Sequence, residues 1–315
     1  MKTASELPWK FPVSDKVEVV GPDVTSSLLK KIEQWATHFF PEATWVRNTY
    51  GIPSVFGCID FSLSKDGEIN VYEIDERPCG LGMSCIVNPK FKKEIEYWKN
   101  SVLRRALVVR GMRASDDEIL FGPSISLQQA LEEKQFFFVL TRNRPDEPGF
   151  HQLRDRSIST ITSEGDKSYG LALNLWETAG VVQTGRREQW VLEEEPTEPC
   201  VFKPRVGKCS HLVKVFFPPH GKVRNIIKHR GEVENSDRIA RIIAGQPGRK
   251  MYRQAFIEPM SFPHQPGKNC MYRFFLAYDT RFRRWAPLGG IWMASKNLII
   301  QGSSDTVCGP LDFKE

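Results

Sequence analysis

The stretch FGCIDFSLSKDGEINVYEIDERPCGLG, residues 56–82, has the pattern of two β-strands joined by a tight turn. In its first half apolar and polar residues alternate, which places Ile59 and Phe61 on one face and Asp60 on the other. Gly67 suits the turn because glycine adopts positive φ without a steric penalty. Regular alternation through the second half predicts that one face of that strand carries Ile69, Val71, Glu73 and Asp75.

Three carboxylates, Asp60, Glu73 and Asp75, are thereby expected at neighbouring positions of one hairpin. Carboxylates held this close repel one another unless a positive group lies among them. Their oxygens are hard ligands of the kind that Mg²⁺ prefers, and Mg²⁺ usually also binds substrate phosphates. The hairpin therefore predicts a magnesium site, and the alternative is an ordinary hairpin whose acids are solvated.

The composition of the 315 residues is that of a globular protein, with 40% hydrophobic and 26% charged residues. No run approaches the roughly 18 apolar residues of a membrane helix, and the proline-broken N-terminus does not resemble a signal peptide. The seven cysteines are scattered and without CxxC spacing, which favours a reducing, cytoplasmic location over zinc or disulfides. The net charge of +6 suits either a nucleic-acid partner or an enzyme with polyanionic ligands.

Helical and strand patterns follow one another along the chain, which indicates an α/β or α+β class. Helices are expected near residues 23–39, 91–107, 126–134 and 168–180, and an apolar strand at residues 136–141. The acidic, proline-flanked run at residues 193–199 predicts a boundary. We expect an N-terminal region with the hairpin at 1–111, an α/β region at 112–195 and a further lobe at 196–315.

The last third contains a second group of signals. The short strand CVFKP ends near Lys203 and leads into a small loop with Gly207, Lys208 and Ser210. A strand–loop–strand of this kind can lay backbone N–H groups along a polyphosphate, although it lacks the spacing of a Walker loop. Further along, a strand at residues 252–259 carries Gln254, Phe256 and Glu258 on one face, and a hairpin at 271–295 carries Arg273.

Together these residues resemble the ATP-grasp superfamily of carboxylate ligases. The resemblance implies that Lys203 binds the nucleotide, that the loop with Gly207, Lys208 and Ser210 covers the phosphates, and that Arg273 meets the transferred phosphate. It also implies an adenine hinge and a ribose-binding acid, carried by Gln254, Phe256 and Glu258. The metal carboxylates of the family correspond to Asp60, Glu73 and Asp75.

Two departures from the family pattern concern Asp75, which stands where the family has Asn, and the order of the motifs. Here the metal hairpin precedes the nucleotide strands, which is the order found in a circularly permuted branch of ATP-grasp proteins. The stretches EIDERPCGLG and APLGGIWMAS resemble an early and a late motif of that branch. The resemblance implies an α+β fold of two lobes with mainly antiparallel sheets around a nucleotide cleft. It also implies that the region at 112–195 lies on the substrate side and that the lobe at 196–315 binds the nucleotide. The implied activity is ADP-forming carboxylate–amine ligation with ATP and Mg²⁺, acting on small-molecule or peptide substrates through an acyl-phosphate.

Two alternatives remain open at this point. The chain could be a basic nucleic-acid-binding protein, with stretches such as KVRNIIKHRGE and TRFRRW along phosphates. It could also be an ATP-grasp protein that phosphorylates a substrate without ligation, or that has lost catalysis. The ligase interpretation makes two structural predictions: the Lys203 strand must neighbour the strand at 252–259, and the hairpin at 56–75 must join the strands at 271–295 in one antiparallel sheet.

Overall fold

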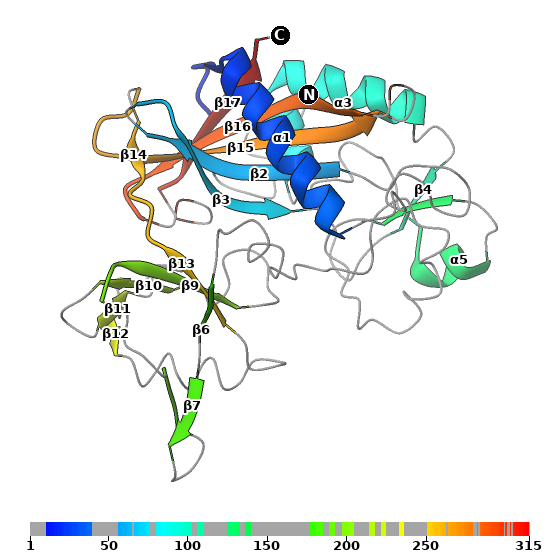
Figure 1. Ribbon diagram of the computed structural model, residues 1–315. Coiled ribbons are helices and arrows are strands. Elements are labelled where there is room, and N and C mark those ends of the chain that lie inside the picture. Colours follow the sequence, from blue (N-terminus) through cyan, green and yellow to red (C-terminus); the bar gives the residue numbers. More distant parts are fainter. Residues whose placement is uncertain are drawn as a thin grey trace.

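A computed structural model describes residues 11–39, 56–64, 66–75, 80–102, 106–109, 125–132, 136–139, 177–179, 181–184, 189–192, 197–204, 214–217, 222–224, 233–235, 251–262, 264–279, 282, 284–298, 300, 303 and 305–314 (Figure 1). Its helices are α1 (Pro22–Phe39), α2 (Leu81–Val87), α3 (Pro89–Val102) and α5 (Leu127–Glu132). Its strands are β1 (Glu18–Val20), β2 (Phe56–Leu63), β3 (Ile69–Asp75), β4 (Ala106–Val109), β5 (Phe136–Val139), β6 (Glu177–Ala179), β7 (Val181–Thr184), β8 (Gln189–Leu192), β9 (Cys200–Pro204), β10 (Lys214–Phe217), β11 (Lys222–Arg224), β12 (Val233–Asn235), β13 (Met251–Ala255), β14 (Met260–Ser261), β15 (Asn269–Asp279), β16 (Arg284–Ser295) and β17 (Val307–Phe313).

The largest sheet in the described residues has seven strands in the order β1-β17-β16-β15-β2-β3, with β14 on β15. Its pairs are antiparallel except for β1, which runs parallel to β17. The early hairpin β2–β3 therefore joins the late hairpin β15–β16, and the second structural prediction is confirmed. Joining such distant segments is possible because loop-closure entropy grows only slowly with loop length. The α+β class is likewise confirmed.

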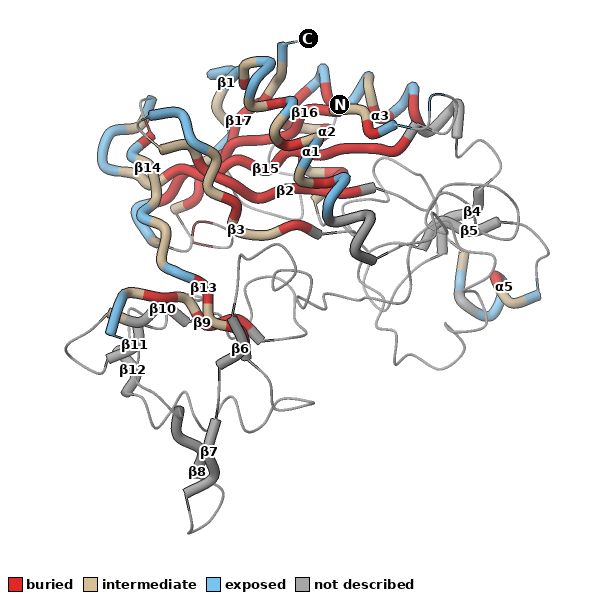
Figure 2. The backbone as a smooth tube through the Cα atoms, viewed as in Figure 1, coloured by how far each residue is buried: buried red, intermediate tan, exposed pale blue. Residues whose placement is uncertain are grey.

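One face of this sheet packs against α1, which crosses it diagonally in Figure 1. Leu28 and Ile32 of α1 share a buried cluster with Ile59 and Phe61 of β2 and Phe274 of β15. The recurrence of apolar residues at three and four along α1 creates the stripe that fits this face. The most buried residues follow the central strands of the sheet (Figure 2), so the core lies here.

The opposite face is covered by α2 and α3. The ring of Phe91 on α3 lies 5.0 Å from that of Phe275 on β15, the neighbour of Phe274 on the other face. Asn88, between the two helices, is buried and its amide nitrogen donates to the carbonyls of Gly290 (2.9 Å) and Leu311 (3.0 Å). Its side-chain oxygen accepts from the Phe91 amide at 3.0 Å, so Asn88 caps α3 and fastens it to two strands.

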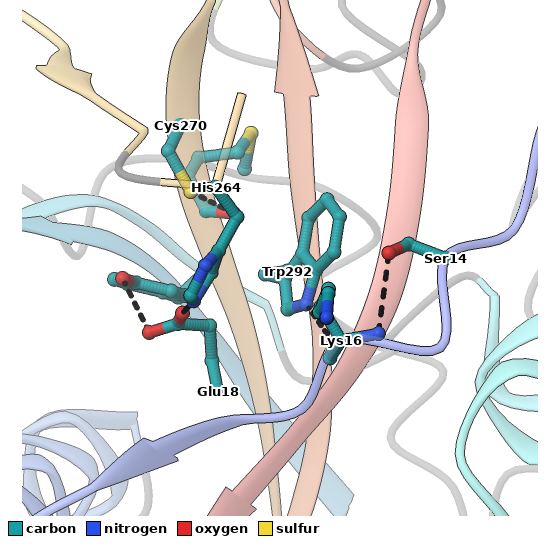
Figure 3. A network of polar contacts seen from close by, with 8 residues as sticks. Ser14, Lys16, Glu18, His264, Cys270 and Trp292 are labelled. Atoms are coloured by element: carbon teal, nitrogen blue, oxygen red, sulfur yellow. Dashed lines mark hydrogen bonds and ion pairs between the residues drawn. The ribbon is translucent and has the colours of Figure 1, made fainter. Parts of the chain in front are cut away.

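The N-terminal segment, which includes β1, is held beside β17 at the edge of the sheet opposite β3 (Figure 3). The indole nitrogen of Trp292 donates to the Lys16 carbonyl at 2.9 Å. The Glu18 carboxylate lies 2.6 Å from His264 Nε2 and accepts from the Tyr272 hydroxyl at 3.5 Å. Because His264 follows β14, these contacts join β1 to the segment that leads from β13 into β15.

The second sheet is antiparallel throughout, in the order β12-β11-β10-β9-β13-β6. Within it β9 pairs with β13, with Lys203 opposite Tyr252, and the first structural prediction is confirmed. Two smaller pairs are β4–β5, which is parallel, and β7–β8. No helix in the described residues combines the length and apolar character needed to span a membrane.

One expected element is wrong where the structure describes it. Residues 168–180 were expected to be helical, but Glu177–Ala179 form β6, whose partner is β13. Strand preference depends strongly on the neighbouring strand, so pairing with β13 decides the conformation of this segment. The helices expected near 23–39, 91–107 and 126–134 are present as α1, α3 and α5, and the expected strand at 136–141 is β5. The end of the second helix is wrong, because α3 ends at Val102 and residues 106–107 belong to β4.

Candidate active site

A row of charged side chains crosses the sheet on the face covered by α2 and α3. Arg273 of β15 stands opposite Asp60 of β2, which stands opposite Glu73 of β3. Arg273 Nε donates to Asp60 Oδ1 at 2.8 Å, and Nη2 donates to Oδ2 at 2.6 Å. Both side chains are buried, each with an exposure of 7%. Two parallel hydrogen bonds between charged groups offset part of the cost of removing them from water.

The alternation of β3 is interrupted by a β-bulge at Tyr72. Asp60 pairs with Glu73, but Phe61 pairs with Val71, so Tyr72 has no partner in the register. A bulge adds one residue to one strand and turns the side chains beyond it by one position. Val71 therefore lies in the α1-side cluster, and Glu73 lies on the opposite face with Asp60. The expectation that Val71 and Glu73 share a face is wrong for this reason.

Tyr72 itself lies on the α2-side face, where alternation from Val71 places it. Its hydroxyl donates to Ser62 Oγ at 2.9 Å, and its side chain packs against the buried cluster that contains Met271 and Ile291. Burial raises the pKa of the Tyr72 hydroxyl, and the hydrogen bond with Ser62 partly opposes that rise. Tyr72 is therefore a neutral, partly buried neighbour of the charged row.

Two side chains of the second sheet reach the edge strand β3 at this bulge. Lys203 Nζ donates to the Tyr72 carbonyl at 2.7 Å, and Gln254 Nε2 donates to the Val71 carbonyl at 3.1 Å. Lys203 and Gln254 lie on one face of the second sheet, since Gln254 pairs with Val201, two residues before Lys203. The two sheets thus meet one residue from Glu73.

The ammonium group of Lys203 is removed from water. Its side chain is 7% exposed, and burial lowers its pKa from 10.5 to about 8, while the charge of Asp60 acts in the opposite direction. Desolvation disfavours a charged amine, whereas a nearby carboxylate favours it. Lys203 therefore lies within the electrostatic field of the charged row as well as on the edge of β3.

The remaining predicted nucleotide residues lie just beyond β13. The Phe256 amide donates to the Pro199 carbonyl at 3.0 Å, and the Phe256 ring lies 5.0 Å from the ring of Phe217. Glu258 is exposed two residues further on. The segment after β13 is thus held against the start of β9 by its backbone.

A glycine that the sequence reasoning did not single out lies close to Arg273. Gly80, before α2, has φ +90°, and a Cβ there would lie 3.9 Å from Arg273 Nη1. On β16, a Cβ on Gly290 would collide with the Arg273 carbonyl. Gly290 therefore lets the two strand backbones approach closely at Arg273, whereas Gly80 is required by its positive φ. The signals in the sequence are the glycines of CGLG and PLGG.

Some predicted site residues cannot be placed. Gly207, Lys208 and Ser210 lie outside the described residues, as does the side chain of Asp75, whose backbone pairs with Cys58. Across the residues that the structure describes, no three His, Cys, Asp or Glu side chains are grouped so that they could hold a metal ion. The trio of Asp60, Glu73 and Asp75 stays a prediction.

Asp305, in the connection from β16 to β17, has a structural role. Asp305 accepts from Ser295 Oγ (2.5 Å) and from the Lys296 amide (2.8 Å), which closes the connection from β16 to β17. Burial alone would raise the pKa of Asp305, but these hydrogen bonds and the charge of Lys268 outweigh it and lower the pKa.

The chain matches no protein-family model, and no curated protein shows significant sequence similarity to it.

Proposed function

We propose that the chain is an ATP-dependent ligase that activates a carboxylate as an acyl-phosphate and joins it to an amine, with release of ADP. The observation that carries the proposal is the meeting of the two sheets. Lys203 contacts β3 one residue before Glu73, beside the buried pair of Arg273 and Asp60. Cations and carboxylates on adjoining strands are what a triphosphate with Mg²⁺ requires.

The residues fit these ligands in their chemistry. Asp60 and Glu73 face the same side of adjacent strands, and Mg²⁺ needs only one or two carboxylates in addition to substrate phosphates. Each oxygen of Asp60 accepts one hydrogen bond from Arg273, and a carboxylate oxygen has a second lone pair for a metal ion. Glu73, Asp60 and Asp75 would hold Mg²⁺, which lowers the charge on the phosphates of ATP.

Each remaining residue has a defined role in this proposal. Lys203 holds a phosphate, and Arg273 stabilises negative charge on the transferred phosphoryl group. The backbone beside Phe256 contacts adenine, and Glu258 binds the ribose. The segment with Gly207, Lys208 and Ser210 covers the phosphates, with Lys208 as a further cation. The carboxylate and amine are small molecules or peptides.

The deciding experiment measures ADP release by the full chain with ATP, Mg²⁺ and panels of amino-acid and peptide substrates. We expect Glu73→Ala to lower Mg²⁺-dependent ADP release by about 100-fold or more, because the variant loses charge stabilisation at the phosphates. Its melting temperature is expected to stay near that of the wild type, since removing one of several neighbouring acids relieves repulsion. Glu68→Ala is the matched control, because Glu68 is an exposed acid on the turn of the same hairpin.

The alternatives give different results in the same assay. ADP release that needs a carboxylate but no amine identifies a kinase. Absence of ADP release, together with no rise in melting temperature on adding ATP and Mg²⁺, overturns the nucleotide site. In that case salt-dependent binding to nucleic acid supports the basic binding protein.

A further inference from the structure

Two consecutive carbonyl groups of β3 accept hydrogen bonds from the same neighbour. Along a regular strand, successive carbonyls point to opposite edges, so only one of any two can face a given neighbour. Here the carbonyls of Val71 and Tyr72 both meet the second sheet, through Gln254 and Lys203. The bulge at Tyr72 breaks the alternation at this point, and it presents two acceptors where a regular edge presents one.

From this arrangement we infer that Gln254 is a positioning residue that docks the second sheet on the bulge of β3. Its amide is buried, with an exposure of 4%, and it donates to a backbone carbonyl of the other sheet. In the family resemblance this position belongs to the adenine hinge. The geometry instead directs its side chain to the backbone of the carboxylate hairpin.

The two donors differ in charge, and that difference assigns their roles. Lys203 is a cation, so an anionic ligand competes with the Tyr72 carbonyl for the hydrogen bonds that its ammonium group donates. Gln254 is neutral, and its hydrogen bond to Val71 does not depend on that competition. Gln254 therefore keeps β9 and β13 against β3 whichever group Lys203 contacts. It also protects the edge of β3, whose outward carbonyls need partners once they are buried.

The test is amide hydrogen exchange on the full chain without nucleotide, so its outcome does not depend on ATP binding. In Gln254→Met, which keeps the side-chain length but cannot donate, we expect exchange in β9 and β13 to accelerate about tenfold. Exchange in β15 and β16 is expected to stay at the wild-type rate. Ala255→Ser is the matched control, since Ala255 is exposed on the same strand.

A second variant separates hydrogen bonding from packing. In Gln254→Glu the ionised carboxylate cannot donate to the Val71 carbonyl, but the protonated carboxyl group can. We therefore expect the protection of β9 and β13 amides from exchange in Gln254→Glu to recover on acidification, relative to the wild type at the same pH. In Gln254→Met this protection is not expected to recover. Wild-type protection in Gln254→Met overturns the inference, as does acceleration spread equally over both sheets. Equal pH dependence of the two variants also overturns it.

Discussion

The buried charge of Lys203 makes the stability of this protein depend on alkaline pH in a calculable way. Its pKa is lowered by burial to about 8, against 10.5 in the unfolded chain. Between these values the unfolded chain binds the proton and the folded chain has released it, so raising the pH favours folding. Below pH 8 the charged amine destabilises the fold, by about 3 kcal/mol relative to its neutral form, at about 1.4 kcal/mol per pKa unit.

The perturbation is Lys203→Met, which keeps the length of the side chain and removes its charge. Stability is measured by urea denaturation of both proteins from about pH 7 to about pH 9.5. We expect the unfolding free energy of the wild type, relative to that of the variant, to rise by about 2 kcal/mol between pH 8 and pH 9.5. Lys296→Met is the control, because Lys296 is exposed.

The comparison between variants is necessary because other groups titrate in the same window. Burial raises the pKa of Cys308 to about 11 and also raises the pKa of Tyr72. Titration of both groups therefore lowers the free energy of unfolding as the pH rises. These contributions are common to the wild type and to Lys203→Met, and they cancel in the difference. Parallel stability curves for these two proteins above pH 8 would refute the burial of a charged amine at the β3 edge.

Three further predictions concern the fold around the site. Asp60→Ala leaves the buried Arg273 without its counter-ion, so urea denaturation should show a loss of about 3–5 kcal/mol, and a loss under about 1 kcal/mol contradicts the buried pairing. Asn88→Ala removes an N-cap and the donor to two buried carbonyls, and about 3 kcal/mol should be lost in the same assay, with wild-type stability as the contrary result. Gly309→Ala places a methyl group against the Trp292 ring, and the overpacking should cost about 1–3 kcal/mol of stability. The melting temperature should therefore fall, and an unchanged melting temperature argues against this contact.

Much of the fold was predictable because its signals are local. The alternation in residues 56–75 and the apolar stripe of α1 each depend on neighbours within a few positions along the chain. The order of motifs also led to the two strand pairings, β9 with β13 and β2 with β15, that the structure contains. The helix expected at 168–180 failed because Glu177–Ala179 pair with a strand more than seventy residues away in sequence.

For the site, the sequence by itself determined which charged residues occur on which strands: Asp60 and Glu73 on one hairpin, Arg273 on another, and Lys203 on a third segment. Their pairing was decided only by the tertiary structure. Strict alternation places Glu73 on the face of Val71, and the bulge at Tyr72 moves it to the face of Asp60. A bulge depends on the register against the neighbouring strand, which no local pattern in VYEID encodes. The separate register of β15 against β2 aligns Arg273 with Asp60, and the edge position of β3 brings Lys203 and Gln254 to its carbonyls.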